Sequence, residues 1–132
     1  MTYFISGHRD LTQEEFNDHY VPTLTHILKK DPMAYFVVGD WEGCDTMALE
    51  WLLTHSDYPD VYVYYVDKVR VTLFGEKLIN FYNVMLRPCT SYDECDSRMT
   101  QDSDFDVAWI RPGRENSHTA MNIKRRYNLK TL

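Results

Sequence analysis

The feature that most constrains the fold is the run MAYFVVG at residues 33–39, which is almost wholly apolar and leads into a glycine turn. A strand with one face in water alternates apolar and polar residues, whereas a strand covered on both faces is continuously apolar. Such coverage is typical of parallel sheets, because their crossover helices pack on both faces. The run therefore predicts a buried parallel strand.

Strand-like apolar runs alternate with helical patterns along much of the chain. Further strands are predicted at 2–6, 61–66 and 106–110. Helices are predicted at 11–30, from residue 45 onward, and at 117–127. This alternation indicates right-handed βαβ units. We therefore expect an α/β fold: a single Rossmann-like domain over residues 1–132, with a mostly parallel sheet of four to five strands and helices on both faces.

The first helical segment carries a start signal and a break. Thr12 and Glu15 fit a capping box, and Leu11 with Phe16 fits the hydrophobic staple around it. Pro22 lies within the same segment and has no backbone N–H to donate. We expect it to bend this helix or to divide it in two.

The middle of the chain is less clearly patterned. Residues 69–74 fit a strand or an extended loop, and 76–86 fit either a helix or a strand. Residues 67–90 as a whole would serve as a lid or an edge strand. Ser91 and Glu94 form another capping-box pattern, which predicts a short helix through Met99.

Acidic residues outnumber basic residues 20 to 14, for a net charge of −6. A general nucleic-acid binder needs a basic face. The basic cluster of this chain lies near its end, at Lys124, Arg125, Arg126 and Lys130. It fits a solvated helix C-terminus, where cations interact favourably with the dipole. Nucleic acid is therefore not expected as a partner.

The 3 cysteines, Cys44, Cys89 and Cys95, are odd in number and form no C-x-x-C pair. We expect neither a disulfide framework nor a zinc site, and a reducing compartment fits best. No apolar run approaches the roughly 18 residues of a membrane span, and residues 1–10 lack the pattern of a signal peptide. The sequence predicts a soluble cytoplasmic protein that carries no metal or cofactor and does not enter a membrane.

Three glycine-containing loops directly follow predicted strands. They are SGHRD at 6–10, GDWEGCD at 39–45 and RPGRENSHT at 111–119. In parallel α/β sheets, ligands bind beyond the carboxyl ends of the strands, where the strand order reverses. We therefore expect the three loops to form one ligand site.

The loop GDWEGCD has no basic residue and three acids, Asp40, Glu42 and Asp45. Gly39 and Gly43 permit tight backbone angles and the close approach of a ligand. Carboxylates suit the hydroxyls of a ribose, and the amides at a helix start favour an anion. Asp45 fits equally well as the N-cap of the helix, a role worth about 1 kcal/mol.

The loop SGHRD offers a patch of donors through Ser6, Gly7, His8 and Arg9. An arginine in this position can hold a phosphate through two parallel hydrogen bonds. The alternative is a surface ion pair between Arg9 and Asp10, which would be weak. His8 has no second ligand at a useful spacing and does not indicate a metal site.

The loop RPGRENSHT combines arginines, a glycine, hydroxyls and the amides of a helix start, which together describe a phosphate pocket. Its candidate residues are Arg111, Gly113, Arg114, Ser117, His118 and Thr119, with Arg98 as a further charge from the preceding segment. The alternative is a long surface loop with an ordinary Ser/Thr cap. On the first interpretation, arginines neutralise the phosphate of a nucleotide while the acidic turn holds its sugar.

The order of these motifs resembles the SLOG superfamily, which is named for sensory domains and the LOG (lonely guy) phosphoribohydrolases. The matching motifs are I-S-G-x-R, V-G-D-x-x-G-x-D, R-M-T and S-D-F-D-V-A-W-I-R-P-G, ahead of a T-A-M-N-I helix. The resemblance implies a Rossmann-like fold with a nucleotide or NAD-derived ligand at the loop ends of the sheet. Oligomers are common among related proteins, so a homodimer or higher homo-oligomer is an open expectation.

The LOG enzymes carry the motif P-G-G-x-G-T-x-x-E. Pro112 and Gly113 match its start and Thr119 matches its threonine, although the spacing here is longer. Its catalytic glutamate falls at Asn122, which cannot act as a carboxylate. Arg98 resembles the arginine that precedes the motif. The LOG route to glycosidase activity therefore lacks its glutamate in this chain.

Three functions remain open from the sequence. The first is a binding protein that senses or sequesters a nucleotide or a nucleotide-derived ligand. The second is an N-glycosidase of nucleoside 5′-monophosphates, in which Asp45 or Glu42 stabilises an oxocarbenium-like state as the base departs, with Arg98 nearby. The third is a protein-interaction module on an emptied Rossmann scaffold, since tyrosines suit interfaces.

Overall fold

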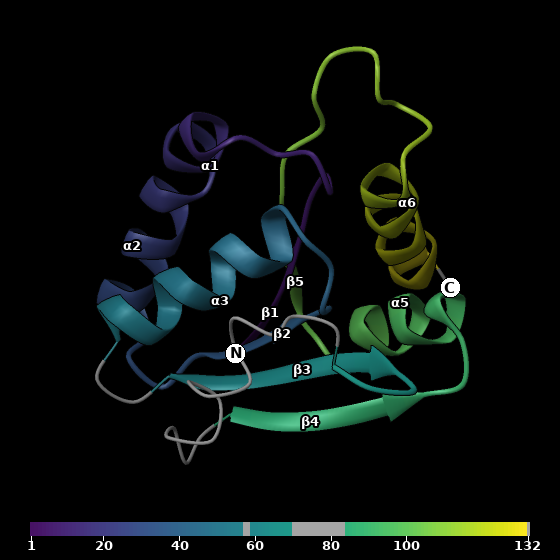
Figure 1. Cartoon of the computed structure of the whole chain (residues 1–132), viewed down its shortest axis with the longest axis horizontal. Coiled ribbons are helices and arrows are strands. Elements are labelled where there is room, and N and C mark those ends of the chain that lie inside the picture. Colours follow the sequence, from purple (N-terminus) through teal and green to yellow (C-terminus); the bar gives the residue numbers. More distant parts are fainter. Residues whose placement is uncertain (57–58, 70–83, 132) are drawn as a thin grey trace.

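The computed structural model describes residues 1–56, 59–69 and 84–131, which form one sheet of five parallel strands and the helices around it (Figure 1). The strands are β1 (Thr2–Ser6), β2 (Tyr35–Val38), β3 (Asp60–Val66), β4 (Val84–Cys89) and β5 (Phe105–Ala108). The helices are α1 (Gln13–His19), α2 (Val21–Lys30), α3 (Cys44–His55), α5 (Tyr92–Gln101) and α6 (His118–Thr131). The predicted α/β class with a parallel sheet is confirmed.

The strands lie in the order β4-β3-β2-β1-β5, and each neighbouring pair is parallel. From β1 to β4 the chain adds strands on one side of β1. It then crosses the sheet to place β5 on the other side of β1. The strand order therefore reverses beside β1, which is where open α/β sheets bind their ligands.

Alternate residues of the central strands enter two hydrophobic clusters, one on each face of the sheet. Ile5 and Phe36 pack into the cluster that contains the buried residues of α1, α2 and α3. Phe4 and Val37 pack into the other cluster, together with Met99 of α5. Figure 1 shows α1 to α3 grouped apart from α5 and α6. The helices thus cover both faces, as a parallel sheet requires.

The predicted break in the first helical segment is confirmed. The Thr12 side chain accepts from the N–H of Glu15 at 3.1 Å, and Glu15 accepts from the N–H of Thr12 at 3.0 Å. This capping box starts α1, and the helix ends at Tyr20. Pro22 stands in the first turn of α2, where its missing N–H removes no helical hydrogen bond.

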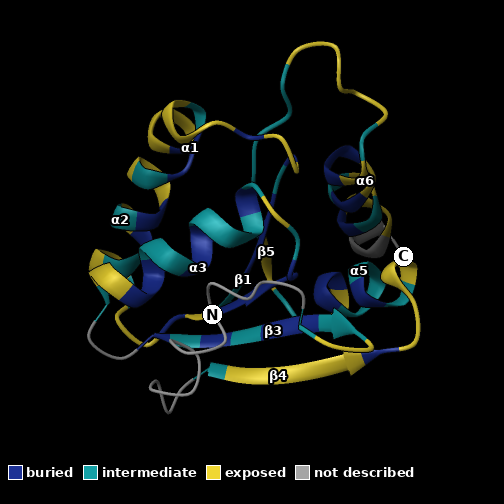
Figure 2. Cartoon of the chain, viewed as in Figure 1, coloured by how far each residue is buried: buried dark blue, intermediate teal, exposed yellow. Residues whose placement is uncertain are grey.

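Strand β4 lies at one edge of the sheet, and Figure 2 shows most of it exposed. The alternatives for 69–74 and 76–86 fall largely outside the described residues, apart from residue 69 and the segment 84–86, which belongs to β4. The helix predicted after Ser91 is present as α5, and the Ser91 hydroxyl accepts from the N–H of Glu94 at 3.1 Å. No described helix is both long and apolar enough to span a bilayer.

The expectation that the cysteines form no disulfide is wrong. Cys89 at the end of β4 and Cys95 in α5 are bonded, with their Cα atoms 5.5 Å apart. The chain turns back from the strand into the helix over two residues, which brings positions six apart in sequence together. Cys44 is a free thiol and is buried, and burial raises its pKa well above the ordinary value.

Candidate ligand site

A pocket of about 300 Å³ lies at the carboxyl ends of β1 and β2, on the side of the sheet that carries α5 and α6. Segments far apart in sequence form its walls. The lining residues come from β1 and the loop after it (Phe4, Ser6, Gly7, Arg9), the β2–α3 turn (Gly39, Asp40, Trp41, Asp45), β3 (Tyr64), α5 (Tyr92, Cys95, Asp96, Met99) and α6 (His118, Thr119, Asn122). We refer to this cavity as the main pocket.

A second cavity of about 470 Å³ lies at the start of α6. It shares Gly7, Arg9, His118 and Thr119 with the main pocket, so the two cavities are neighbours. The rest of its lining comes from His8, Asp10, Glu42, Arg114 and Ser117. The structure thus brings all three predicted loops to this end of the sheet.

The glycines of the β2–α3 turn are required by contacts within the protein. Gly43 has a φ of 80°, and a Cβ at this position would lie 2.2 Å from the carbonyl oxygen of Arg9. The amide of Cys44 donates to the carbonyl of His8 at 3.2 Å, which joins the same two loops. A Cβ on Gly39 would lie 2.6 Å from Oδ2 of Asp45. These close approaches explain both glycines without a ligand.

Asp45 lines the main pocket, but it is not the N-cap of α3 as the sequence suggested. The N-cap is Gly43, whose positive φ begins the helix without a side-chain bond. Asp45 lies in the first turn of α3, and its Oδ2 accepts from the N–H of Trp41 at 3.1 Å. The carboxylate therefore fixes the turn that forms the pocket wall.

Arg9, Trp41 and Tyr92 form one side of the main pocket. The Arg9 guanidinium lies 3.9 Å from the centroid of the Trp41 ring, and the centroids of Trp41 and Tyr92 are 5.0 Å apart. Arg9 also pairs with Glu42 at 3.6 Å. The suggested alternative partner, Asp10, is instead bound to arginines of the loop after β5.

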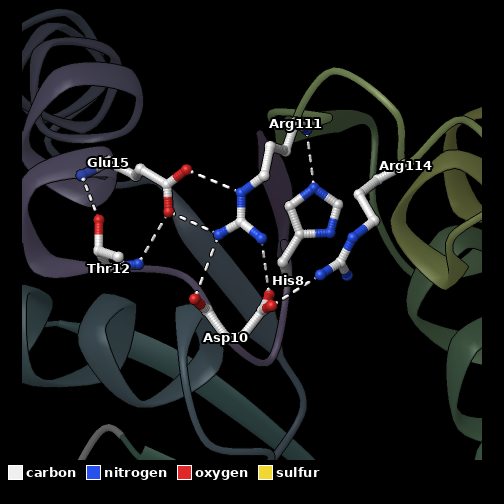
Figure 3. A network of polar contacts seen from close by, with 6 residues as sticks. All are labelled: His8, Asp10, Thr12, Glu15, Arg111 and Arg114. Atoms are coloured by element: carbon white, nitrogen blue, oxygen red, sulfur yellow. Dashed lines mark hydrogen bonds and ion pairs between the residues drawn. The ribbon is translucent and has the colours of Figure 1, made fainter.

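Arg111 lines neither cavity, because it joins the β5–α6 loop to the start of α1 (Figure 3). Its Nε and one terminal nitrogen donate to the two carboxylate oxygens of Glu15 at 2.9 and 2.6 Å. Its other terminal nitrogen donates to Asp10 at 3.1 Å. Hydrogen bonds from Arg111 and Thr12 lower the pKa of Glu15 to about 2. Arg111 is therefore a structural residue in this arrangement.

Arg114 donates to the second oxygen of Asp10 at 2.7 Å and still lines the second cavity (Figure 3). Gly113 has a φ of 89°, and its N–H donates to Glu115 at 3.0 Å. It is exposed, lines neither cavity and therefore serves the loop turn. Ser117 accepts from the N–H of Ala120 at 3.2 Å, so its hydroxyl caps α6.

His8 is buried and holds two strand ends together (Figure 3). Its Nε2 accepts from the backbone N–H of Arg111 at 2.8 Å, which assigns the proton of the neutral ring to Nδ1. Burial lowers the pKa of His8, and the neighbouring cations of Arg111 and Arg114 lower it further. The ring thus stays neutral and acts as an acceptor.

Arg98 lies away from the main pocket, on the side of α5 that faces β4. It donates to the carbonyl of Pro88 at 2.8 Å and lies 5.4 Å from the Tyr64 ring centroid. It lines a separate cavity with Arg87 and Asp102. The structure therefore does not bring Arg98 to the residues with which the sequence grouped it.

Several pocket residues were missed by the sequence analysis, above all Asp96 and the aromatic residues Trp41, Tyr64 and Tyr92. Tyr92, Asp96 and Met99 recur at helical spacing along α5. This stripe on one face of the helix was the sequence pattern that could have identified them as pocket residues. Burial raises the pKa of the Asp96 carboxyl, while the positive charge of Arg125, and that of His118 when it is protonated, oppose this rise. The Nδ1 of His118 lies 3.8 Å from the carboxylate.

Ser6 is the most informative residue of the main pocket. The residue is 5% exposed, and its hydroxyl oxygen has no hydrogen-bond partner among the described residues. Buried hydroxyls are normally paired, because an unpaired one costs free energy. A hydroxyl left unpaired at the wall of a cavity indicates a site prepared for an external group.

No protein-family model, curated protein or solved structure matches this chain. The resemblance to the SLOG superfamily therefore stays a prediction from its motifs. Within the described residues, no group of three or more His, Cys, Asp or Glu side chains is arranged to hold a metal ion.

Proposed function

We propose that this protein binds a nucleotide or a nucleotide-derived ligand, with the nucleoside in the main pocket and the phosphate in the second cavity. The observation that carries the proposal is the unpaired hydroxyl of Ser6 in a cavity at the reversal point of a parallel sheet. Cavities of roughly 300–1,000 Å³ at this position are typical of small-molecule sites.

The composition of the two cavities supports this orientation. The main pocket combines aromatic rings with the carboxylates Asp40 and Asp45, which can accept hydrogen bonds from ribose hydroxyls. The second cavity has Arg9, Arg114 and His118 beside the start of α6. Arginine cations and helix amides of this kind stabilise a phosphate. The shared lining lets one ligand occupy both cavities.

The experiment measures the binding of nucleoside monophosphates to the purified chain by isothermal titration calorimetry. Arg9→Gln removes a cation that lines both cavities and is expected to weaken binding about tenfold. Arg87→Gln is the matched control, because Arg87 is also exposed and lies over an aromatic ring, 4.8 Å from the Tyr62 centroid. Absence of nucleotide binding at millimolar concentration, or equal loss in both variants, would refute the proposal.

A second candidate function is hydrolysis of the N-glycosidic bond, which is favoured by the carboxyl groups that line one pocket, among them Asp45 and Asp96. Glu42 does not line the main pocket and pairs with Arg9 at the surface, so Asp45 is the better candidate. Chromatography of incubated nucleoside monophosphates separates the two functions. Base release that Asp45→Asn abolishes supports hydrolysis, and binding without release supports a sensing or sequestering protein.

A further inference from the structure

We propose that the Cys89–Cys95 disulfide is a site of thiol–disulfide exchange, at which a small thiol that enters the main pocket attacks Cys95 and releases Cys89 as a thiolate beside Arg98. This site goes beyond the binding of a nucleotide, because it takes a thiol and forms a covalent bond with it. The inference follows from the access to one end of the disulfide and from the cation at its other end.

Cys95 is the end of the disulfide that a small molecule can approach. It is only 4% exposed, yet it lines the main pocket. Cys89 is also buried, and it lines neither the main pocket nor the other two cavities described above. The outcome of thiol exchange depends on which sulfur atom the attacking thiolate reaches. A thiol small enough to enter a cavity of about 300 Å³ is therefore expected to attack Cys95.

Arg98 is placed to stabilise the thiolate that this attack releases. Its Nη1 lies 3.8 Å from Sγ of Cys89 and donates to the carbonyl of Pro88 at 2.8 Å, which holds the guanidinium in place. A neighbouring cation stabilises a thiolate, and a more stable thiolate leaves more readily. Glu94 pairs with the same nitrogen at 3.7 Å, but a partly exposed pair of this kind is weak.

The two ends of the disulfide differ in their charged surroundings. Among the described residues, a cation contacts the sulfur of Cys89 and none contacts the sulfur of Cys95. Attack on Cys89 would release Cys95 as a thiolate into the pocket that the carboxyl of Asp96 also lines. Negative charges close to each other are unfavourable. Access and charge therefore both favour attack at Cys95.

The exchange step conserves the number of sulfur–sulfur bonds. The attacking thiol gives up its proton to solvent, and its sulfur forms a bond with Sγ of Cys95. The bond between Cys89 and Cys95 breaks, and its electron pair stays on Sγ of Cys89. The thiol is thereby oxidised to a mixed disulfide, and Cys89 is reduced to a thiolate. The step also opens the covalent link between β4 and α5, the helix that carries Tyr92, Asp96 and Met99 of the pocket wall.

The test exposes the native chain to millimolar 2-mercaptoethanol and takes samples at a series of early time points. Free thiols are then alkylated with N-ethylmaleimide in acidic denaturant, and fragment-ion mass spectra assign each modification. The mixed disulfide is expected on Cys95 with the alkyl group on Cys89, about tenfold more often than the reverse. Cys44 is a free thiol, so its alkylation in every sample serves as the internal reference.

A mixed disulfide found mainly on Cys89, or equally on the two cysteines, would overturn the inference. The absence of a mixed disulfide on Cys95 at every time point would overturn it as well, because the bond would then be a structural link alone. These outcomes are read on the native chain, so they do not depend on the folding of any variant.

The role of Arg98 is tested by the rate at which the disulfide opens. Arg98→Gln is expected to slow opening by roughly three- to tenfold, and Arg98→Lys, which keeps a cation, should restore most of the rate. Arg87→Gln is the matched control, because the Arg87 guanidinium lies over Tyr62 instead, 4.8 Å from the ring centroid. Equal rates in Arg98→Gln and the native chain would overturn this role, and melting temperatures check that the variants are folded.

Discussion

The buried hydroxyl of Tyr20 donates a hydrogen bond of 2.7 Å to the carbonyl of Ser6, the last residue of β1. The same hydroxyl accepts from the N–H of Trp109 at 3.0 Å, just beyond β5. Tyr20 also marks the boundary between α1 and α2. One side chain thus binds the carboxyl ends of both β1 and β5. The strand order reverses between these two strands.

Tyr20→Phe is expected to lower the free energy of unfolding by about 1–3 kcal/mol, because it leaves the buried carbonyl of Ser6 and the partly buried N–H of Trp109 without their partner. Urea denaturation followed by tryptophan fluorescence measures the change. Tyr127→Phe is the control, since Tyr127 is 68% exposed. Equal stability of the two variants would show that the Tyr20 hydroxyl does not hold the strand ends.

The His8 contact predicts a pH-dependent loss of stability. The pKa of His8 is lowered in the folded protein, so the unfolded chain binds a proton first as the pH falls. Stability is complete above the ordinary pKa of about 6.5 and decreases as the pH falls from there through the lowered pKa. His8→Gln should reduce this slope between pH 6.5 and 5 in thermal melts. His26→Gln, at an exposed position on α2, should retain it.

A second loss of stability is expected at lower pH because of Glu15. Its pKa is lowered from 4.5 to about 2 by hydrogen bonds from Arg111 and Thr12. The stabilisation is present above pH 4.5 and is lost as the pH falls toward 2. Glu15→Gln should be less stable than the native chain at pH 7 and lose less stability on acidification. Glu14→Gln, in the same helical turn, should differ little from the native chain at either pH; a matching effect there would rule out the specific role of Glu15.

Ser6→Ala is expected to separate stability from binding. Removal of an unpaired buried hydroxyl should leave the melting temperature unchanged or raise it slightly. If the hydroxyl binds the ligand, nucleotide affinity should fall by roughly five- to tenfold. A variant that is clearly destabilised, or that binds nucleotides as well as the native chain, would contradict this role of Ser6.

The sequence predicted the sheet because its signals are local. The apolar run at 33–39 and the capping box at Thr12 and Glu15 depend on neighbouring residues, and both predictions are confirmed. The predicted N-cap at Asp45 is wrong because Gly43 starts the helix with a positive φ. The position of this N-cap depends on the close approach of the β2–α3 turn to the loop after β1, which local sequence patterns do not reveal.

The site was predicted less completely because its partners are distant in sequence. Arg111 resembles a phosphate ligand until the fold brings it to Glu15, 96 residues away. Asp96 resembles an ordinary exposed helix residue until α5 packs beside the carboxyl ends of β1 and β2. The convergence of the three loops could be predicted from the alternation of strands and helices. The ion pairs among the loops could not, because they depend on side-chain positions that the sequence does not give.

The walls of the main pocket include β1, the first strand of the chain, and α6, its last described helix. During synthesis on a ribosome, the amino-terminal strands can pair well before α6 has left the exit tunnel. The pocket itself is completed only after translation has passed residue 122, since Thr119 and Asn122 belong to its wall. A nascent chain stalled before α6 would therefore contain most of the sheet but only a partly walled ligand site.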